Sequence, residues 1–148
     1  RKPWPFVQSP AQEDGGLFSP NGQWMAYSSN ESGKNEVCVV SFPKRERKWQ
    51  ISNGGGIVPI WSRNGKELFY INGSSLMVVN VLSSNTFDLS VPRKVCEIPT
   101  NVTLWDISPD GQRFLAVVTK THQLTVPRLE VVTDWFEAVE AKCAGNKH

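Results

Sequence analysis

The carboxylates are the residues of this chain whose types and placement could do chemistry. Glu13 and Asp14 are adjacent, and Asp106 follows a short apolar run much later in the sequence. Two carboxylates that face each other across a cleft can act as acid and base in hydrolysis. Because the sequence does not give the distance between these side chains, a carboxylate-based hydrolase stays an open alternative at this stage.

The remaining reactive side chains form no recognisable catalytic set. His122 and His148 stand alone, without a cysteine or carboxylate at the spacing of metal ligands. The three cysteines are an odd number at irregular spacings, which fits neither a disulfide framework nor a zinc pattern. We expect Cys38 and Cys96 to be small core residues. The sequence therefore predicts no catalytic residues, no metal and no cofactor, and favours a protein that is not an enzyme.

Charge and hydropathy exclude two classes of partner. The 148 residues carry 16 Lys and Arg against 14 Asp and Glu, a net charge of +2 that is too small to indicate nucleic acid. The basic run at residues 44–48 contains Glu46 and reads as a solvated loop. No apolar run approaches the roughly 20 residues that cross a bilayer. We expect no nucleic-acid binding and no insertion into a membrane.

A ten-residue pattern occurs three times, as FSPNGQWMAY, WSRNGKELFY and ISPDGQRFLA. The serines that begin its turns, Ser19, Ser62 and Ser108, are 43 and 46 residues apart, a period that matches the blade of a β-propeller. We expect each serine hydroxyl and the following Asn or Asp side chain to bind the turn backbone, with Gly at positive φ. The pattern is thus a hairpin that joins the innermost strand of a blade to the next.

Each repeat should supply antiparallel strands rich in β-branched and aromatic residues. The fold class predicted is all-β, a partial propeller of about three four-stranded blades. Its expected parts are an N-terminal outer strand that completes a neighbouring blade (1–14), blade 1 (15–56), blade 2 (57–102), a three-stranded blade 3 (103–136) and a polar C-terminal tail (137–148).

These motifs resemble the repeat of TolB-like and WD-like propellers, and the match is specific over residues 18–42. The whole chain, including NGGGIVPIWSRNGKELFY and LEVVTDWFEAV, resembles the C-terminal TolB-like region of predicted bacterial Ser/Thr kinases. The resemblance implies a propeller used for protein contacts, usually periplasmic or otherwise outside the cytoplasm. It implies no kinase activity, because nothing in the sequence resembles a kinase catalytic region.

Closure of the ring requires more than three blades, since a propeller has at least about four. An outer strand at the N-terminus and a third blade without a fourth strand would complete each other between two chains placed head to tail. We therefore expect a homodimer with six blades and two-fold symmetry. The residues expected to pair in this exchange are Trp4, Phe6, Val7, Leu129 and Val131. The alternative is a fragment whose missing blades lie elsewhere.

Ligands of propellers usually meet the central channel, so the residues that enter the innermost strands are the predicted binding residues. They are Glu13, Asp14, Val58, Pro59, Thr103 and Trp105. The leading hypothesis is a non-catalytic module, with a sensor or scaffold role, that binds a protein, a peptide or a small ligand at the channel mouth. The alternatives are a hydrolase that uses channel carboxylates and an assembly fragment that completes a larger propeller.

Overall fold

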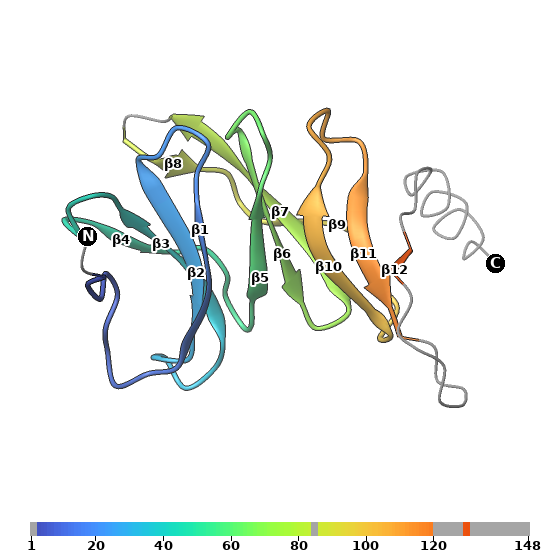
Figure 1. Ribbon diagram of the computed structural model, residues 1–148, viewed down its shortest axis with the longest axis horizontal. Helices are drawn as coiled ribbons and strands as arrows, with labels where there is room; N and C mark the ends of the chain where they lie inside the picture. The colour runs from blue at the N-terminus through green and yellow to red at the C-terminus, as the bar shows by residue number, and fades with distance from the viewer. Residues whose placement is uncertain (1–2, 84–85, 120–128, 131–148) are drawn as a thin grey trace.

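The computed structural model describes residues 3–83, 86–119 and 129–130, and all of their regular structure is β-strand. Figure 1 shows the strands as three antiparallel sheets that stand side by side in chain order. This confirms the predicted fold class, an all-β partial propeller. None of the described residues belongs to a helix long and apolar enough to cross a membrane.

Blade 1 has the strand order β1-β2-β3-β4, as the sequence predicts. Its strands are β1 (Glu13–Phe18), β2 (Trp24–Ser29), β3 (Glu36–Ser41) and β4 (Lys48–Gln50). The density of Val in β3 explains its central place, because β-branched side chains pack well on both faces of a pleated sheet. The shorter and more polar β4 lies at the outer edge.

Blade 2 has five strands where the sequence predicts four. They are β5 (Ile57–Trp61), β6 (Glu67–Asn72), β7 (Ser75–Ser83), β8 (Asp88–Leu89) and β9 (Arg93–Glu97). The nine-residue β7 is long enough to pair with β9 along its first half and with β8 at its end. The link before β9, predicted without structure, therefore forms a strand of its own.

Blade 3 contains β10 (Val102–Ile107), β11 (Phe114–Val118) and β12 (Leu129–Glu130) in that order. These match the three strands expected in this blade. Val131 and the predicted tail, residues 137–148, lie outside the described residues.

Apolar side chains fill both spaces between neighbouring blades. Along β6, Leu68 and Tyr70 pack toward blade 1, whereas Phe69 and Ile71 pack toward blade 3. This alternation follows from the two-residue period of a strand. We name the two sides of a blade its preceding face and its following face, after the neighbour in sequence that each one meets.

An aromatic cluster strengthens the contact between blades 1 and 2. Phe87, from the link between β7 and β8, lies with its ring centroid 4.7 Å from that of Trp24 and 4.8 Å from that of Trp49. Trp61 completes the cluster, its ring 6.2 Å from Phe87. Tilted and edge-to-face pairs of this kind add stability beyond the area that they bury.

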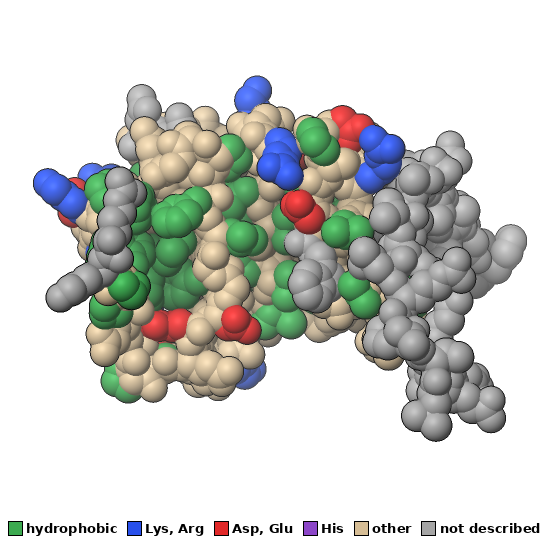
Figure 2. All heavy atoms as spheres, in the orientation of Figure 1, with side chains coloured by type: hydrophobic (Ala, Val, Ile, Leu, Met, Phe, Trp, Pro, Cys, Tyr) green, Lys and Arg blue, Asp and Glu red, His purple; other side chains and the backbone are tan. Residues whose placement is uncertain are grey.

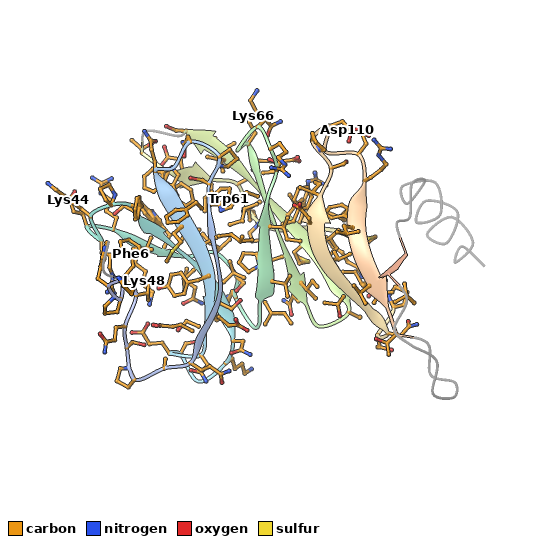
Figure 3. All side chains as sticks on the ribbon, viewed as in Figure 1. Phe6, Lys44, Lys48, Trp61, Lys66 and Asp110 are labelled. Carbon is orange, nitrogen blue, oxygen red and sulfur yellow. The ribbon has the colours of Figure 1, made fainter. Side chains whose placement is uncertain are left out.

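The three predicted turns share one hydrogen-bond pattern. In the second, the Ser62 hydroxyl donates to Asn64 Oδ1 (2.8 Å) and accepts from the Glu67 N–H (2.9 Å), while Gly65 has φ +68°. Ser19 and Ser108 make the equivalent bonds in the first and third turns. The prediction from the repeat is confirmed, and Figure 3 shows Lys66 and Asp110 at the same end of the molecule.

Residues 3–12 form no strand in the single chain, although the sequence predicts an outer strand over residues 1–14. Phe6 and Val7 pack instead on the apolar side of β2 and β3, and Trp4 lies beside Phe6 with its side chain 63% exposed. The first strand begins at Glu13. Strand exchange with a second chain therefore stays a proposal.

The turn chemistry leads to a stability prediction for Ser62→Ala. The substitution removes the three hydrogen bonds of the Ser62 hydroxyl and leaves the Glu67 N–H without its partner, at a residue only 2% exposed. We expect a loss of about 1–3 kcal/mol in the free energy of unfolding, measured in urea. Ser32→Ala, at an exposed hydroxyl, is the matched control. Equal losses in the two variants would contradict this role.

A second prediction concerns pH. Hydrogen bonds from the Ser108 hydroxyl and the Gln112 N–H hold the pKa of the Asp110 carboxyl below its ordinary value of 3.8. Since the folded-state pKa is the lower one, the ionised carboxyl stabilises the turn above pH 3.8, and this contribution disappears as the pH falls through the folded-state pKa.

An NMR titration of the Gly111 amide shift should therefore have its midpoint below pH 3.8. In Asp110→Asn, the third turn has the same amide chemistry as the other two, and this titration should vanish. A midpoint at or above the ordinary value would show that the turn does not favour the ionised form.

Candidate binding groove

The innermost strands β1, β5 and β10 each lie at an edge of their sheet and neighbour one another along the front of the molecule in Figure 1. A direct hydrogen bond links the first two, from Trp61 Nε1 to the Leu17 carbonyl oxygen (3.2 Å). Figure 3 shows Trp61 between β1 and β5. The inner edges of blades 1 and 2 are thus held at a fixed separation.

Each innermost strand has a β-bulge at nearly the same place in the repeat. The register slips at Gly15 and Gly16 in β1, at Val58 and Pro59 in β5, and at Trp105 in β10. All of these positions lie three or four residues before the turn serine. A bulge bends its strand and re-aims side chains, so the same device shapes the channel side of all three blades.

A groove of about 580 Å³ lies where the bulges of β1 and β5 face each other. Its size falls within the range of ligand sites. One wall is backbone, because Gly15 and Gly16 carry no side chain, and the other is apolar. The apolar residues that line the groove are Leu17, Ile57, Val58, Pro59 and Ile60.

Polar groups gather where the two strands enter the groove. Gln12, Asp14, Ser28 and Asn35 line this part. Asp14 is exposed and its Oδ1 accepts the Gly15 N–H (2.7 Å), which orients the carboxylate at the rim. The groove therefore combines an apolar floor with an acidic entrance.

The structure brings only some of the predicted binding residues together. Asp14, Val58 and Pro59 line the groove, whereas Glu13 is held by the Ser9 hydroxyl, which donates to its Oε1 (2.8 Å). Adjacent residues of a strand point to opposite faces, so Glu13 and Asp14 do not form a pair. Thr103 is exposed on β10 and lines no part of this groove.

The third carboxylate considered, Asp106, is engaged elsewhere. Its Oδ2 lies 3.6 Å from Nη2 of Arg63, and its Oδ1 accepts the Ile107 N–H (2.8 Å). Both charged side chains are more than half exposed, so this ion pair between blades 2 and 3 is weak. Among the described residues, no three His, Cys, Asp or Glu side chains come together as metal ligands do.

A buried carboxylate that sequence reasoning missed supports the groove. Glu36 is 5% exposed, and its oxygens accept hydrogen bonds from the Ser52 hydroxyl and from the N–H groups of Gly54 and Gly55. These bonds satisfy the charge and fix the loop that leads into β5. Burial, with Glu36 nearby, raises the pKa of Tyr70. The run of three glycines before β5 is the one sequence signal of this loop.

Val58 leads to a prediction because its φ is +54°, in the left-handed region. A β-branched residue is strained there, at a cost of about 1–3 kcal/mol. Val58→Gly relieves the strain, whereas Val58→Ala keeps it; both variants lose the two methyl groups, and the Gly variant also loses the Cβ. We expect the Gly variant to be more stable than the Ala variant by about 1 kcal/mol in urea unfolding.

The usual order in a strand is the reverse, with Gly less stable than Ala by about 0.5–1 kcal/mol. A matched pair at Val39, in the middle of β3 and fully buried, should show this usual order. If Val58 also follows the usual order, its backbone is not strained.

Comparison with known proteins shows the fold. No protein-family model and no curated protein matches the chain. Among solved structures, TolB from Acinetobacter baumannii superposes with a TM-score of 0.55 at 14% identity, over 76% of this chain and 28% of TolB. A protein from Bacteroides uniformis assigned as a 6-phosphogluconolactonase gives 0.51 at 21% identity, over 86% and 41%.

An oligogalacturonate lyase from Vibrio parahaemolyticus gives a TM-score of 0.48 at 14% identity, over 68% of this chain and 27% of the lyase. The chain thus spans well under half the length of each of these proteins. At such identities the likeness concerns the fold and no activity. The chain has the fold of a TolB-like β-propeller, of which it supplies three blades.

Proposed function

We propose that this chain is a non-catalytic binding module whose groove between β1 and β5 takes an extended peptide. The observation that carries the proposal is the position of the groove between β1 and β5, each the edge strand of its sheet, beside the exposed backbone of Gly15 and Gly16. Unpaired N–H and C=O groups of an edge strand can pair with an added strand. A peptide strand could bind in the groove in this way without a rearrangement of the strands of blades 1 and 2.

The side chains of the groove indicate which peptide fits. Leu17 and Ile57 are 45% and 40% exposed, so they offer apolar surface to a ligand. Asp14 at the entrance favours a cationic group. The preferred ligand is therefore an extended segment in which an apolar residue lies next to a Lys or Arg.

The hydrolase alternative has less support. Glu13 and Asp14 lie on opposite faces of β1, and Asp106 contacts Arg63 rather than a second carboxylate. A pair of carboxylates in one cleft, which acid-base hydrolysis requires, has no candidate among these three residues. The proposed binding module has a sensor or scaffold role, and it neither binds nucleic acid nor inserts into a membrane. Its proposed compartment is the one that the family resemblance implies, the periplasm or another space outside the cytoplasm.

The proposal predicts binding of an eight-residue peptide of alternating Val and Lys, and weaker binding of the Val and Glu counterpart. Titration of the ¹⁵N-labelled chain should shift the amides of Gly15 and Gly16 first, because they form the groove wall. Ile57→Lys should weaken binding of the Val and Lys peptide about tenfold, since it places a charge on the apolar floor and repels the lysines.

Leu82→Lys is the matched control, because Leu82 is also an exposed apolar residue but lies on β7, away from the groove. Shifts centred outside the groove would contradict the proposal, as would equal affinities of the two variants. Cleavage of the peptide during the titration would favour the hydrolase.

A further inference from the structure

The interfaces between blades follow one rule of position. Six and eight residues after the turn serine, Leu68 and Tyr70 of blade 2 pack on blade 1, and Phe114 and Ala116 of blade 3 pack on blade 2. These positions form the preceding face of their blade. The residue seven positions after the serine, such as Phe69, belongs to the following face.

Blade 1 has the residues of a preceding face, although no described blade lies before it. Met25 and Tyr27 occupy its positions six and eight, and Tyr27 corresponds to Tyr70. With Cys38 and Val40 they form an apolar cluster. Figure 2 shows hydrophobic side chains gathered at this end of the molecule, where the N-terminal residues lie against blade 1. The preceding face of blade 1 thus has the apolar composition of one side of an interface between two blades.

Residues 3–8 now cover this face in place of a blade. Phe6 and Val7 pack on the cluster, and the Phe6 ring lies 5.1 Å from that of Phe42. Figure 3 shows Phe6 against the sheet of blade 1, near Lys48. In the described part of the chain, the first hydrogen bonds that hold the N-terminal segment to blade 1 are made by Ser9 and Gln12, after residues 3–8. The cover is held by side-chain packing and buries the cluster, since Tyr27, Cys38 and Val40 are only 3–5% exposed, whereas Trp4 of the cover itself is 63% exposed.

The opposite end of the chain supplies a complementary surface. Leu115 and Val117 are seven and nine residues after Ser108, the positions of a following face, and both are partly exposed. The equivalent Phe69 and Ile71 of blade 2 are buried against the next blade. The chain therefore carries both halves of the interface that it already forms twice internally.

We propose that the preceding face of blade 1 docks the third blade of a second copy, and that residues 3–8 are a placeholder which this blade displaces. We choose blade 3 of a second copy as the binding partner because its following face is complementary to the preceding face of blade 1. At both internal interfaces, a following face of this kind packs on a preceding face. Two such contacts, head to tail, close a six-bladed ring with two-fold symmetry. The placeholder covers the apolar face while the chain is a monomer.

Sedimentation equilibrium of the full chain over a dilution series tests the proposal. The expected species is a dimer of about twice 16.6 kDa in equilibrium with monomer. Phe6→Ser should lower the dimer dissociation constant about tenfold, because it weakens the competitor for the face and leaves the docking surfaces intact. A monomer at all concentrations, in both wild type and Phe6→Ser, would overturn the proposal and indicate blades supplied by another source.

Substitutions at the two faces check which surfaces meet. Tyr27→Arg and Leu115→Glu should each abolish the dimer, whereas Leu82→Arg, on β7, should leave it unchanged. A mixture of Tyr27→Arg and Leu115→Glu should associate again, because one interface is wild type and the other pairs opposite charges. This rescue also shows that both variants fold.

Two results would overturn specific parts of the proposal. A dimer that survives both face substitutions would use a different surface. A weaker dimer in Phe6→Ser would mean that the N-terminal residues hold the dimer together, as expected for strand exchange with Leu129 and Val131, and that they are not a placeholder.

Discussion

A blade with apolar side chains on both faces needs a neighbour on each side, and this constraint governs the whole structure. Blade 2 satisfies it completely, because Leu68 and Tyr70 meet blade 1 while Phe69 and Ile71 meet blade 3. Among the described residues, each end blade meets a neighbouring blade on one side only. The cover of residues 3–8 on blade 1 is a direct consequence, since burying an apolar side chain is worth about 1.5–3 kcal/mol.

The turns determine which face each side chain reaches. The serine hydroxyl fixes the hairpin register by bonding the N–H five residues later, as Ser19 does with Trp24 (3.0 Å). A slip of one residue would exchange the two faces of the second strand, so the polar turn controls the apolar packing. This explains why the turn and not the core is the most constant part of the repeat. Met25, Leu68 and Phe114 occupy the same position with different side chains.

Features set by local chemistry could be predicted from the sequence, and features set by contacts between blades could not. The turn at Ser62 was predictable because Ser, Asn and Gly each have a role within six residues. The strain at Val58 depends on the neighbouring blade, and the burial of Glu36 depends on the loop before β5. Neither feature can be predicted from the residue type alone. The extra strand β8 directly follows Phe87, whose side chain packs between blades 1 and 2.

The candidate groove shows why binding and folding can use different parts of the same blade. Packing between blades uses the faces of the strands, including those of the innermost β5 and β10, and it leaves the inner edges of β1 and β5 free of that task. The bulges lie on these innermost strands, and at the bulge of β5 Val58 still packs against the core between blades 2 and 3. Strain at Val58 is tolerated there because Pro59 and Ile60, directly after it, are buried and hold the strand in place. The rigid interfaces thus allow the channel side to keep a backbone geometry that an isolated hairpin would relax.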